Sequence, residues 1–176
     1  MAVIRLIPVA VVISGLVACT SGGTAVARAS VSPTSSTPAS PAPPVGSCPV
    51  TLPAPVPATQ PWRSQLFGSG SAFGNGSLWV GGLPEGGVLH PLNSEVGPGG
   101  AVSRKFGWWR AVPGDLTITA RRLDAAAPPA HGDVPPGYGD QGFQSSGVTF
   151  PTPGCWEVTG SLATTHLTFV VLVLVP

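Results

Sequence analysis

The chain has 176 residues, a formal net charge of +1 and only 9% charged residues. Its eight basic residues form no stripe, so the electrostatic signature of nucleic-acid binding is absent and we predict no nucleic-acid partner. The 24 glycines and 22 prolines favour turns and β structure over helices.

Residues 1–18 have the pattern of a secretory signal peptide. Arg5 precedes the short apolar run 11–17, and small residues follow it. The tetrapeptide LVAC at 16–19 resembles the lipobox of bacterial lipoproteins. This resemblance implies that Cys19 is acylated, becomes the first mature residue and anchors the protein to the cell membrane on its extracytoplasmic face. An ordinary cleaved signal and an uncleaved membrane helix are the alternatives, although a span needs about 20 apolar residues.

Residues 19–61 are predicted to be the lipidated N-terminus followed by a disordered linker. The stretch SPTSSTPASPAPPVGS contains too little apolar surface to offset the entropy of ordering it. Proline-rich segments favour polyproline II and act as semi-rigid spacers. We therefore expect one small folded domain over 62–176.

Two cysteines remain once Cys19 is assigned to the lipid. An exported protein meets an oxidising compartment, so Cys48 and Cys155 are predicted to form a disulfide across a loop of roughly 100 residues. Two unpaired, buried cysteines are the alternative.

Strand patterns dominate the rest of the chain. The run 104–110 and the run 115–123 are separated by a turn, which predicts an antiparallel hairpin. The apolar run 167–175 is half a membrane span, and we expect it to be a central strand covered on both faces. Further strands are expected at 77–80, 148–150 and 156–159. Short strands separated by Gly/Pro turns predict an all-β fold, an immunoglobulin-like β-sandwich.

The tryptophan pair in the run 104–110 is expected to divide between two faces. Phe106, Trp108 and Arg110 share one face of a strand, so Trp108 is predicted to enter the core. Trp109 is then a candidate surface aromatic for a sugar ring or a protein partner. Cover by the loop 128–139 is the alternative.

A long loop, 124–147, is the most function-like region, because long loops in compact domains are often functional or disordered. Its candidate binding residues are His131, Asp133, Tyr138 and Phe143. His131 and Asp133 could contribute to a metal site, but no third ligand stands at a recognisable spacing. We therefore predict no metal and no cofactor.

Catalytic motifs are missing from the sequence. It contains no Gly-x-Ser-x-Gly elbow, its carboxylates are scattered, and its glycine-rich stretches lack the lysine of a phosphate loop. We therefore expect a protein that is not an enzyme.

Three stretches, 78–80, 105–110 and 150–160, resemble motifs of small exported bacterial domains with an immunoglobulin-like fold. The resemblance implies an exported location and this fold, and it transfers no catalytic or binding residue. The sequence thus predicts a membrane-anchored cell-envelope lipoprotein with a non-catalytic binding or structural domain. Its partner would be an envelope protein or a cell-wall component. The alternative is a small-ligand or metal sensor that uses the loop 124–147.

Overall fold

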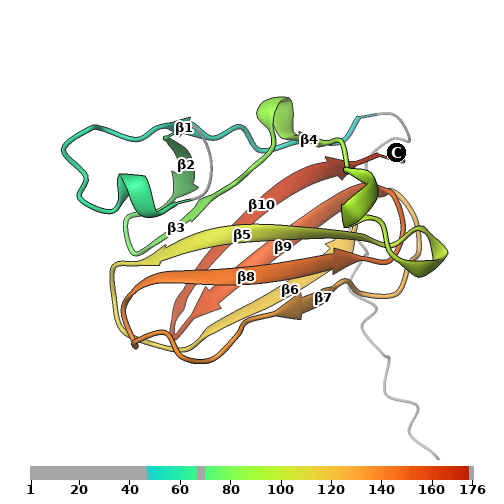
Figure 1. Cartoon of the computed structure of the whole chain (residues 1–176). Coiled ribbons are helices and arrows are strands. Elements are labelled where there is room, and N and C mark those ends of the chain that lie inside the picture. Colours follow the sequence, from blue (N-terminus) through green and yellow to red (C-terminus); the bar gives the residue numbers. More distant parts are fainter. Residues whose placement is uncertain (1–46, 67–69, 175–176) are drawn as a thin grey trace, which may run out of the picture. The chain divides into compact units, whose positions relative to one another are not determined.

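The computed structural model describes residues 47–66 and 70–174, which form two β-sheets packed face to face (Figure 1). The all-β sandwich predicted from the sequence is confirmed. The strands are β1 (Ala54–Pro55), β2 (Ser71–Gly74), β3 (Leu78–Gly81), β4 (Val88–Leu89), β5 (Val102–Arg110), β6 (Leu116–Arg122), β7 (His131–Asp133), β8 (Gly142–Phe150), β9 (Gly154–Leu162) and β10 (Thr165–Val173). Single-turn 3-10 helices are η1 (Arg63–Gln65), η2 (Glu85–Gly87), η3 (Asn93–Glu95) and η4 (Pro98–Gly100).

The two sheets have different sizes. The larger sheet has the order β1-β2-β3-β5-β8-β7, and the smaller has the order β4-β10-β9-β6. β10 pairs with β9 on one side and with β4 on the other, which confirms that the apolar C-terminal run is an interior strand. The expected cover of both faces is wrong, because burial alternates along β10 and Thr168 on its outer face is exposed. Within the described ranges, no helix has the length and apolar character that a membrane crossing requires.

The prediction that β5 and β6 form a hairpin is wrong, although both strands are present. β5 pairs with β3 and β8 in the larger sheet, whereas β6 pairs with β9 in the smaller one. The turn between them carries the chain across the sandwich. Each strand turns its apolar side, Phe106 and Trp108 in β5 and Leu116 in β6, toward the core between the sheets. The alternation of apolar and polar residues therefore predicts which face of a strand is buried, but it does not predict which strand pairs with it.

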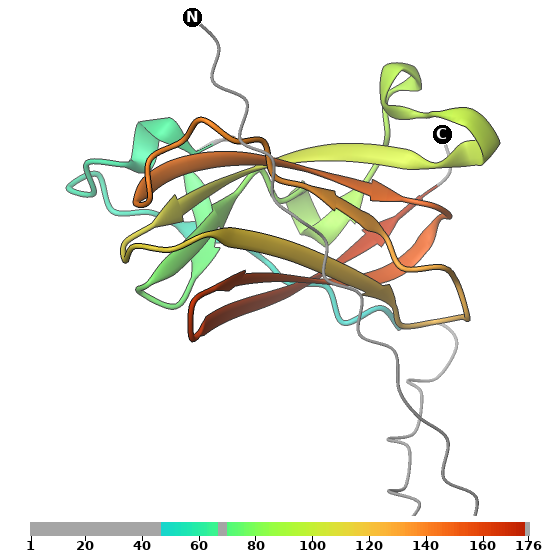
Figure 2. The same cartoon turned by 90° about the horizontal axis from the view of Figure 1, so that it is seen from below.

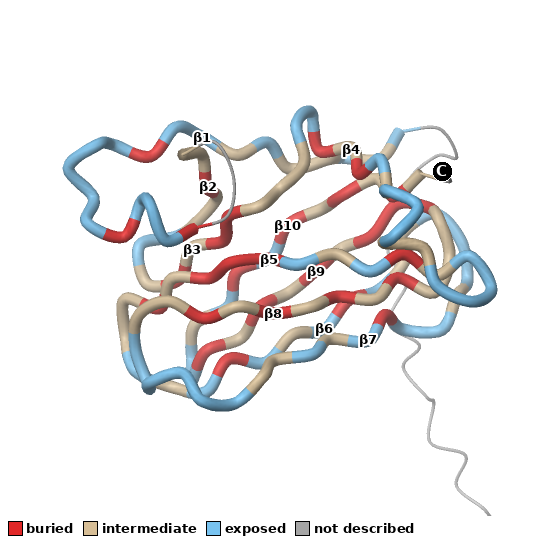
Figure 3. The backbone as a smooth tube through the Cα atoms, in the orientation of Figure 1, coloured by how far each residue is buried: buried red, intermediate tan, exposed pale blue. Residues whose placement is uncertain are grey.

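Aromatic side chains fill the core between the sheets. Figure 3 marks the buried residues along the strands of both sheets in red. The centroid of the Phe169 ring lies 5.3 Å from the centroid of the Phe106 ring and 6.1 Å from that of the Trp108 ring. Gly160 faces Trp108 so closely that a Cβ atom there would lie 2.5 Å from the indole. The indole Nε1 of Trp108 donates a hydrogen bond to Ser146 Oγ at 2.8 Å. The core is therefore shaped around this indole.

The folded domain begins earlier than the predicted boundary at Trp62. Val56 is buried, β1 pairs with β2, and the Thr51 amide donates to the Val170 carbonyl at 2.8 Å. The predicted disulfide is present and joins Cys48 to Cys155 on β9. The composition of this segment did not predict its packing. The segment is rich in proline, and it is ordered by a few isolated apolar residues and one disulfide. The predicted signal peptide, Cys19 and the first part of the linker lie outside the described residues.

Candidate functional site

The region 124–147 is not the single long loop expected from the sequence. β7 lies within it, and β8 begins at Gly142, so only the connections before and after β7 are loops. His131 and Asp133 are on β7, Phe143 is on β8, and Tyr138 alone belongs to a loop. The candidate residues therefore fall into two separate places on the sandwich.

β7 is the edge strand of the larger sheet and lies next to β6 of the smaller sheet, so it covers one side of the sandwich. Figure 2 views the molecule from this side. A Cβ atom on Gly132 would lie 2.6 Å from the carbonyl oxygen of Ile118 on β6, and the Ala130 amide donates to the Ala120 carbonyl at 3.2 Å. The glycine between His131 and Asp133 is thus required by the close approach of two strands. Across residues 47–66 and 70–174, no three His, Cys, Asp or Glu side chains are grouped to hold a metal ion.

Gly132→Ala is expected to lower the free energy of unfolding by about 1–3 kcal/mol, because the added methyl group meets backbone that cannot rotate away. Urea unfolding followed by tryptophan fluorescence measures the change. Gly147→Ala on β8 is the control, since its Cβ would meet only Asp133 Cβ at an ordinary 3.8 Å. Equal stability of both variants would contradict the steric account of Gly132.

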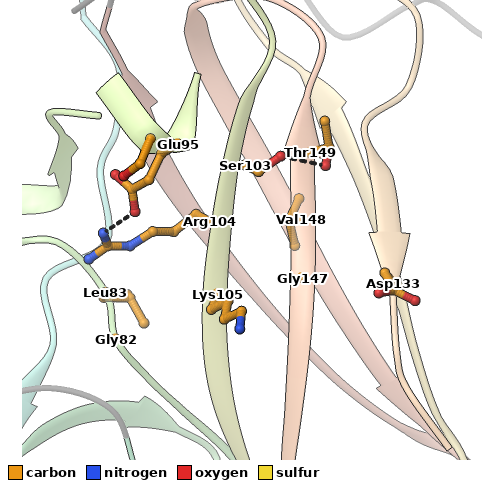
Figure 4. A pocket seen from close by; sticks show the side chains of 11 residues that line it. Gly82, Leu83, Glu95, Ser103, Arg104, Lys105, Asp133, Gly147, Val148 and Thr149 are labelled. Carbon is orange, nitrogen blue, oxygen red and sulfur yellow. Dashed lines mark hydrogen bonds and ion pairs between the residues drawn. The ribbon is translucent and has the colours of Figure 1, made fainter. Parts of the chain in front are cut away.

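A hollow of about 680 Å³, here called the sheet groove, lies over the outer face of β5 and β8 (Figure 4). The segment around Leu83 and Glu95 forms one wall, and Asp133 on β7 stands at the other. Lys105 and Thr149 lie between them. The groove is therefore built on hydrogen-bonded strands, which hold its side chains in a fixed order.

Fixed polar contacts occupy one part of the sheet groove. Arg104 Nη1 donates to Glu95 Oε1 at 2.9 Å, and the Leu92 amide donates to Glu95 Oε2 at 2.8 Å. The hydroxyls of Ser103 and Thr149 share a hydrogen bond of 2.9 Å across the strands. These contacts fix the side chains of one wall and one end of the groove in the absence of a ligand.

Two opposite charges in the sheet groove are not paired with each other. Lys105 is in register with Gly147, and Gly147 is in register with Asp133, so the three residues form one row across β5, β8 and β7. Within the described part of the chain, no ion pair engages Lys105 or Asp133. Because the middle residue lacks a side chain, the two charges flank an open floor.

Glu95 makes stability depend on pH. The hydrogen bond from the Leu92 amide, followed by that from Arg104, lowers the pKa of Glu95 below its ordinary value of 4.5, against the opposing effect of burial. A lowered pKa in the folded state stabilises the fold above the unfolded-state pKa, and this contribution is lost as the pH falls through the folded-state pKa. We expect Glu95→Gln to weaken the loss of stability on acidification below pH 4.5. Thermal unfolding across acidic pH tests this, with Glu85→Gln at an exposed position as the control.

Trp109 does not have the free surface that the sequence suggested. It is half-buried, and the ring of Trp62 stacks on it with centroids 6.0 Å apart and planes 20° apart. Trp62 also contacts Trp79, at 5.2 Å. The segment before β2 therefore covers Trp109. Phe143 packs against the same small cluster, so both candidates serve packing.

Tyr138 is more exposed to solvent than Trp109 and Phe143. Its side chain contacts Phe143 edge-on at 5.9 Å, and the residue is 39% exposed. It lines a second hollow of about 430 Å³, here called the end pocket. The lining residues belong to the end of the sandwich where β5 ends and β8 begins, and these strand ends can be followed in Figure 1. The lining side chains used below are those of Arg110, Asp115, Tyr138, Asp140 and Gln144.

Arg110 is a buried cation at the end pocket. It is 2% exposed, and its guanidinium donates to the carbonyls of Gly114, at 3.0 Å, and of Gly139. Burial lowers the pKa of Arg110, and the nearby carboxylates of Asp140 and Asp115 oppose that shift. The burial of Arg110 could be expected from the sequence, because Arg110 lies on the same strand face as Trp108.

Comparison with known protein families and with curated proteins finds no match for the chain.

Proposed function

We propose that this chain is an exported, lipid-anchored cell-envelope protein whose β-sandwich is a non-catalytic binding module. The lipobox-like sequence before Cys19 supports the anchor, and the disulfide between Cys48 and Cys155 suits an oxidising compartment. The observation that carries the binding role is the sheet groove, where Lys105 and Asp133 flank Gly147 without pairing.

The ligand of the sheet groove is a peptide segment of an envelope protein. Lys105 and Asp133 lie two strand spacings apart, which is about 10 Å. A peptide in the polyproline II conformation rises about 3.1 Å per residue and has three residues per turn, so opposite charges three residues apart lie on one side of it and would meet both side chains. The hydroxyl pair of Ser103 and Thr149 offers further hydrogen bonds beside this row.

We propose binding and not catalysis as the role of the groove. His131 is opposite Thr149 in register, which places a histidine in the same row as two hydroxyls. Among the described residues, however, no hydrogen bond links His131 to Ser103 or Thr149, whose hydroxyls bond to each other. Nucleophile activation needs a base within hydrogen-bond reach of the hydroxyl, and that contact is not formed here.

Photo-cross-linking in living cells tests the groove. A photoreactive residue at Leu83, in the groove wall, is expected to capture a discrete envelope protein, and Lys105→Glu is expected to abolish that product. The same probe at Thr119, on the outer face of the smaller sheet, is the control. Identical products from both positions, or capture unchanged by Lys105→Glu, would refute the groove as the binding surface.

Cys19→Ala is expected to move the protein from the membrane fraction to the medium or soluble fraction, because it removes the lipid attachment. Cell fractionation measures this. The melting temperature of the domain should not change, since the substitution alters none of the contacts described for residues 47–66 and 70–174. Cys48→Ala is the matched control, and it should leave the protein in the membrane while destabilising it. A Cys19→Ala protein that stays in the membrane fraction would contradict the anchor.

A further inference from the structure

The end pocket contains a buried hydrogen-bond acceptor without a donor. Gln144 points inward from β8 and is 7% exposed. Its Nε2 donates to the Pro135 carbonyl at 3.3 Å, while its Oε1 is buried and has no partner within the described residues. Turning the amide over would set its oxygen against the Pro135 carbonyl oxygen, so the hydrogen bond fixes the orientation. A buried oxygen without a protein donor needs a donor from outside the protein, which is a water molecule or a ligand.

Arg110 does not supply that donor. Its guanidinium is directed to backbone carbonyls, those of Gly114 and Gly139, and through Nε to Gly142 at 3.5 Å. It therefore ties the turn after β5 to the loop after β7 and forms the floor of the pocket. No hydrogen bond between Arg110 and Gln144 exists in the described structure.

The rim of the end pocket is acidic. Asp115 and Asp140 are both exposed and both lie close enough to influence Arg110, yet neither forms an ion pair with it among the described residues. Two carboxylates and one guanidinium give the pocket a net charge of −1. The two carboxylates and Gln144 Oε1 are hydrogen-bond acceptors, and together they favour a positively charged donor.

An aromatic ring completes the rim. Tyr138 is 39% exposed and is braced by Phe143, and a tyrosine ring attracts a cation placed over its face. We propose that the end pocket binds a small organic ion with a primary ammonium group. The ammonium donates to Gln144 Oε1, and Asp115 and Asp140 neutralise its charge at the entrance. The volume of about 430 Å³ lies within the range of small-molecule sites. This site is separate from the sheet groove and does not depend on the proposed peptide ligand.

Calorimetric titration of the full-length protein tests the proposal with three probes. 1,5-Diaminopentane is expected to bind, and the neutral analogue 1,5-pentanediol is expected to bind at least about tenfold more weakly, because it lacks the charge. Nα-acetyl-lysine amide separates two sources of the same chemistry. Tighter binding of this probe than of the diamine assigns the site to a lysine-type side chain of a polymer, and weaker binding assigns it to a free amine.

Two variants locate the site. The double substitution Asp115→Asn, Asp140→Asn is expected to weaken diamine binding by about tenfold or more. Gln144→Met, which keeps the length of the side chain but removes the acceptor, is expected to weaken binding with little change in thermal stability. Asp133→Asn removes one carboxylate charge in the sheet groove, where the double variant removes two from the end pocket, and it should leave diamine binding unaltered. Equal affinity for diamine and diol, undiminished binding by the double variant, or no binding of either amine at millimolar concentration would overturn the proposal.

Discussion

Removing the disulfide by the double substitution Cys48→Ala, Cys155→Ala is expected to lower the free energy of unfolding by about 4–5 kcal/mol. The bond joins residues 107 positions apart, so it removes a large part of the freedom of the unfolded chain. Domains of this size are stable by about 5–15 kcal/mol in total, so the loss is a large fraction of the whole. Urea unfolding of the oxidised protein and of the variant measures the difference.

Thr51→Val is the control for the disulfide prediction. The Val170 amide donates to Thr51 Oγ1 at 3.0 Å, so this change removes a non-covalent contact of the same segment. We expect it to cost about 0.5–1.5 kcal/mol, the usual contribution of one hydrogen bond. A cysteine variant that loses no more than Thr51→Val would show that packing alone holds residues 47–61, and that the covalent link is not needed for stability.

Trp108→Ala is expected to cost about 3–5 kcal/mol, the usual range for a fully buried tryptophan. The indole has no exposed surface, lies against Phe169 and fills the space that Gly160 leaves open. Its loss also leaves the buried hydroxyl of Ser146 without the donor that it now has. Differential scanning calorimetry and urea unfolding both measure this loss.

Trp109→Ala is the matched control, because the two tryptophans are neighbours in β5 on opposite faces of the sheet. Trp109 is half-buried against Trp62, so its truncation leaves a smaller cavity and should cost less. Trp108→Phe separates the two contributions, since it keeps an aromatic ring and removes the hydrogen bond to Ser146. Equal losses for Trp108→Ala and Trp109→Ala would contradict the assignment of Trp108 to the centre of the core.

The sequence allowed the class of fold and most of the long strands to be predicted, because alternating apolar residues and turn dipeptides are local signals. The first part of β8 was an exception, since residues 142–147 were expected in a loop. The strand partners could not be predicted in the same way. β5 and β6 both present an apolar face, and either a hairpin or a crossing between sheets would bury it. The short strands β1, β2 and β4 carry too few residues for a period to appear.

The candidate site was predicted in part. The inward position of Trp108 follows from alternation and is confirmed. The cover of Trp109 by Trp62 was missed, because it depends on a contact between distant segments and on where the domain begins. Gln144 was missed because a polar residue on the inward face of a strand looks like a solvent-exposed one until its neighbours are known. The lipid anchor at Cys19 stays a prediction.

The bond between Cys48 and Cys155 also determines how the domain responds to mechanical tension through its N-terminal segment. The pull reaches β9, which lies between β10 and β6, through a covalent bond and not through the short edge strand β1. The 107 positions between the cysteines form a closed loop, and at about 3.5 Å per residue about 370 Å of chain cannot be drawn out. Both the sheet groove and the end pocket belong wholly to this loop. Tension can lengthen the chain only outside the loop.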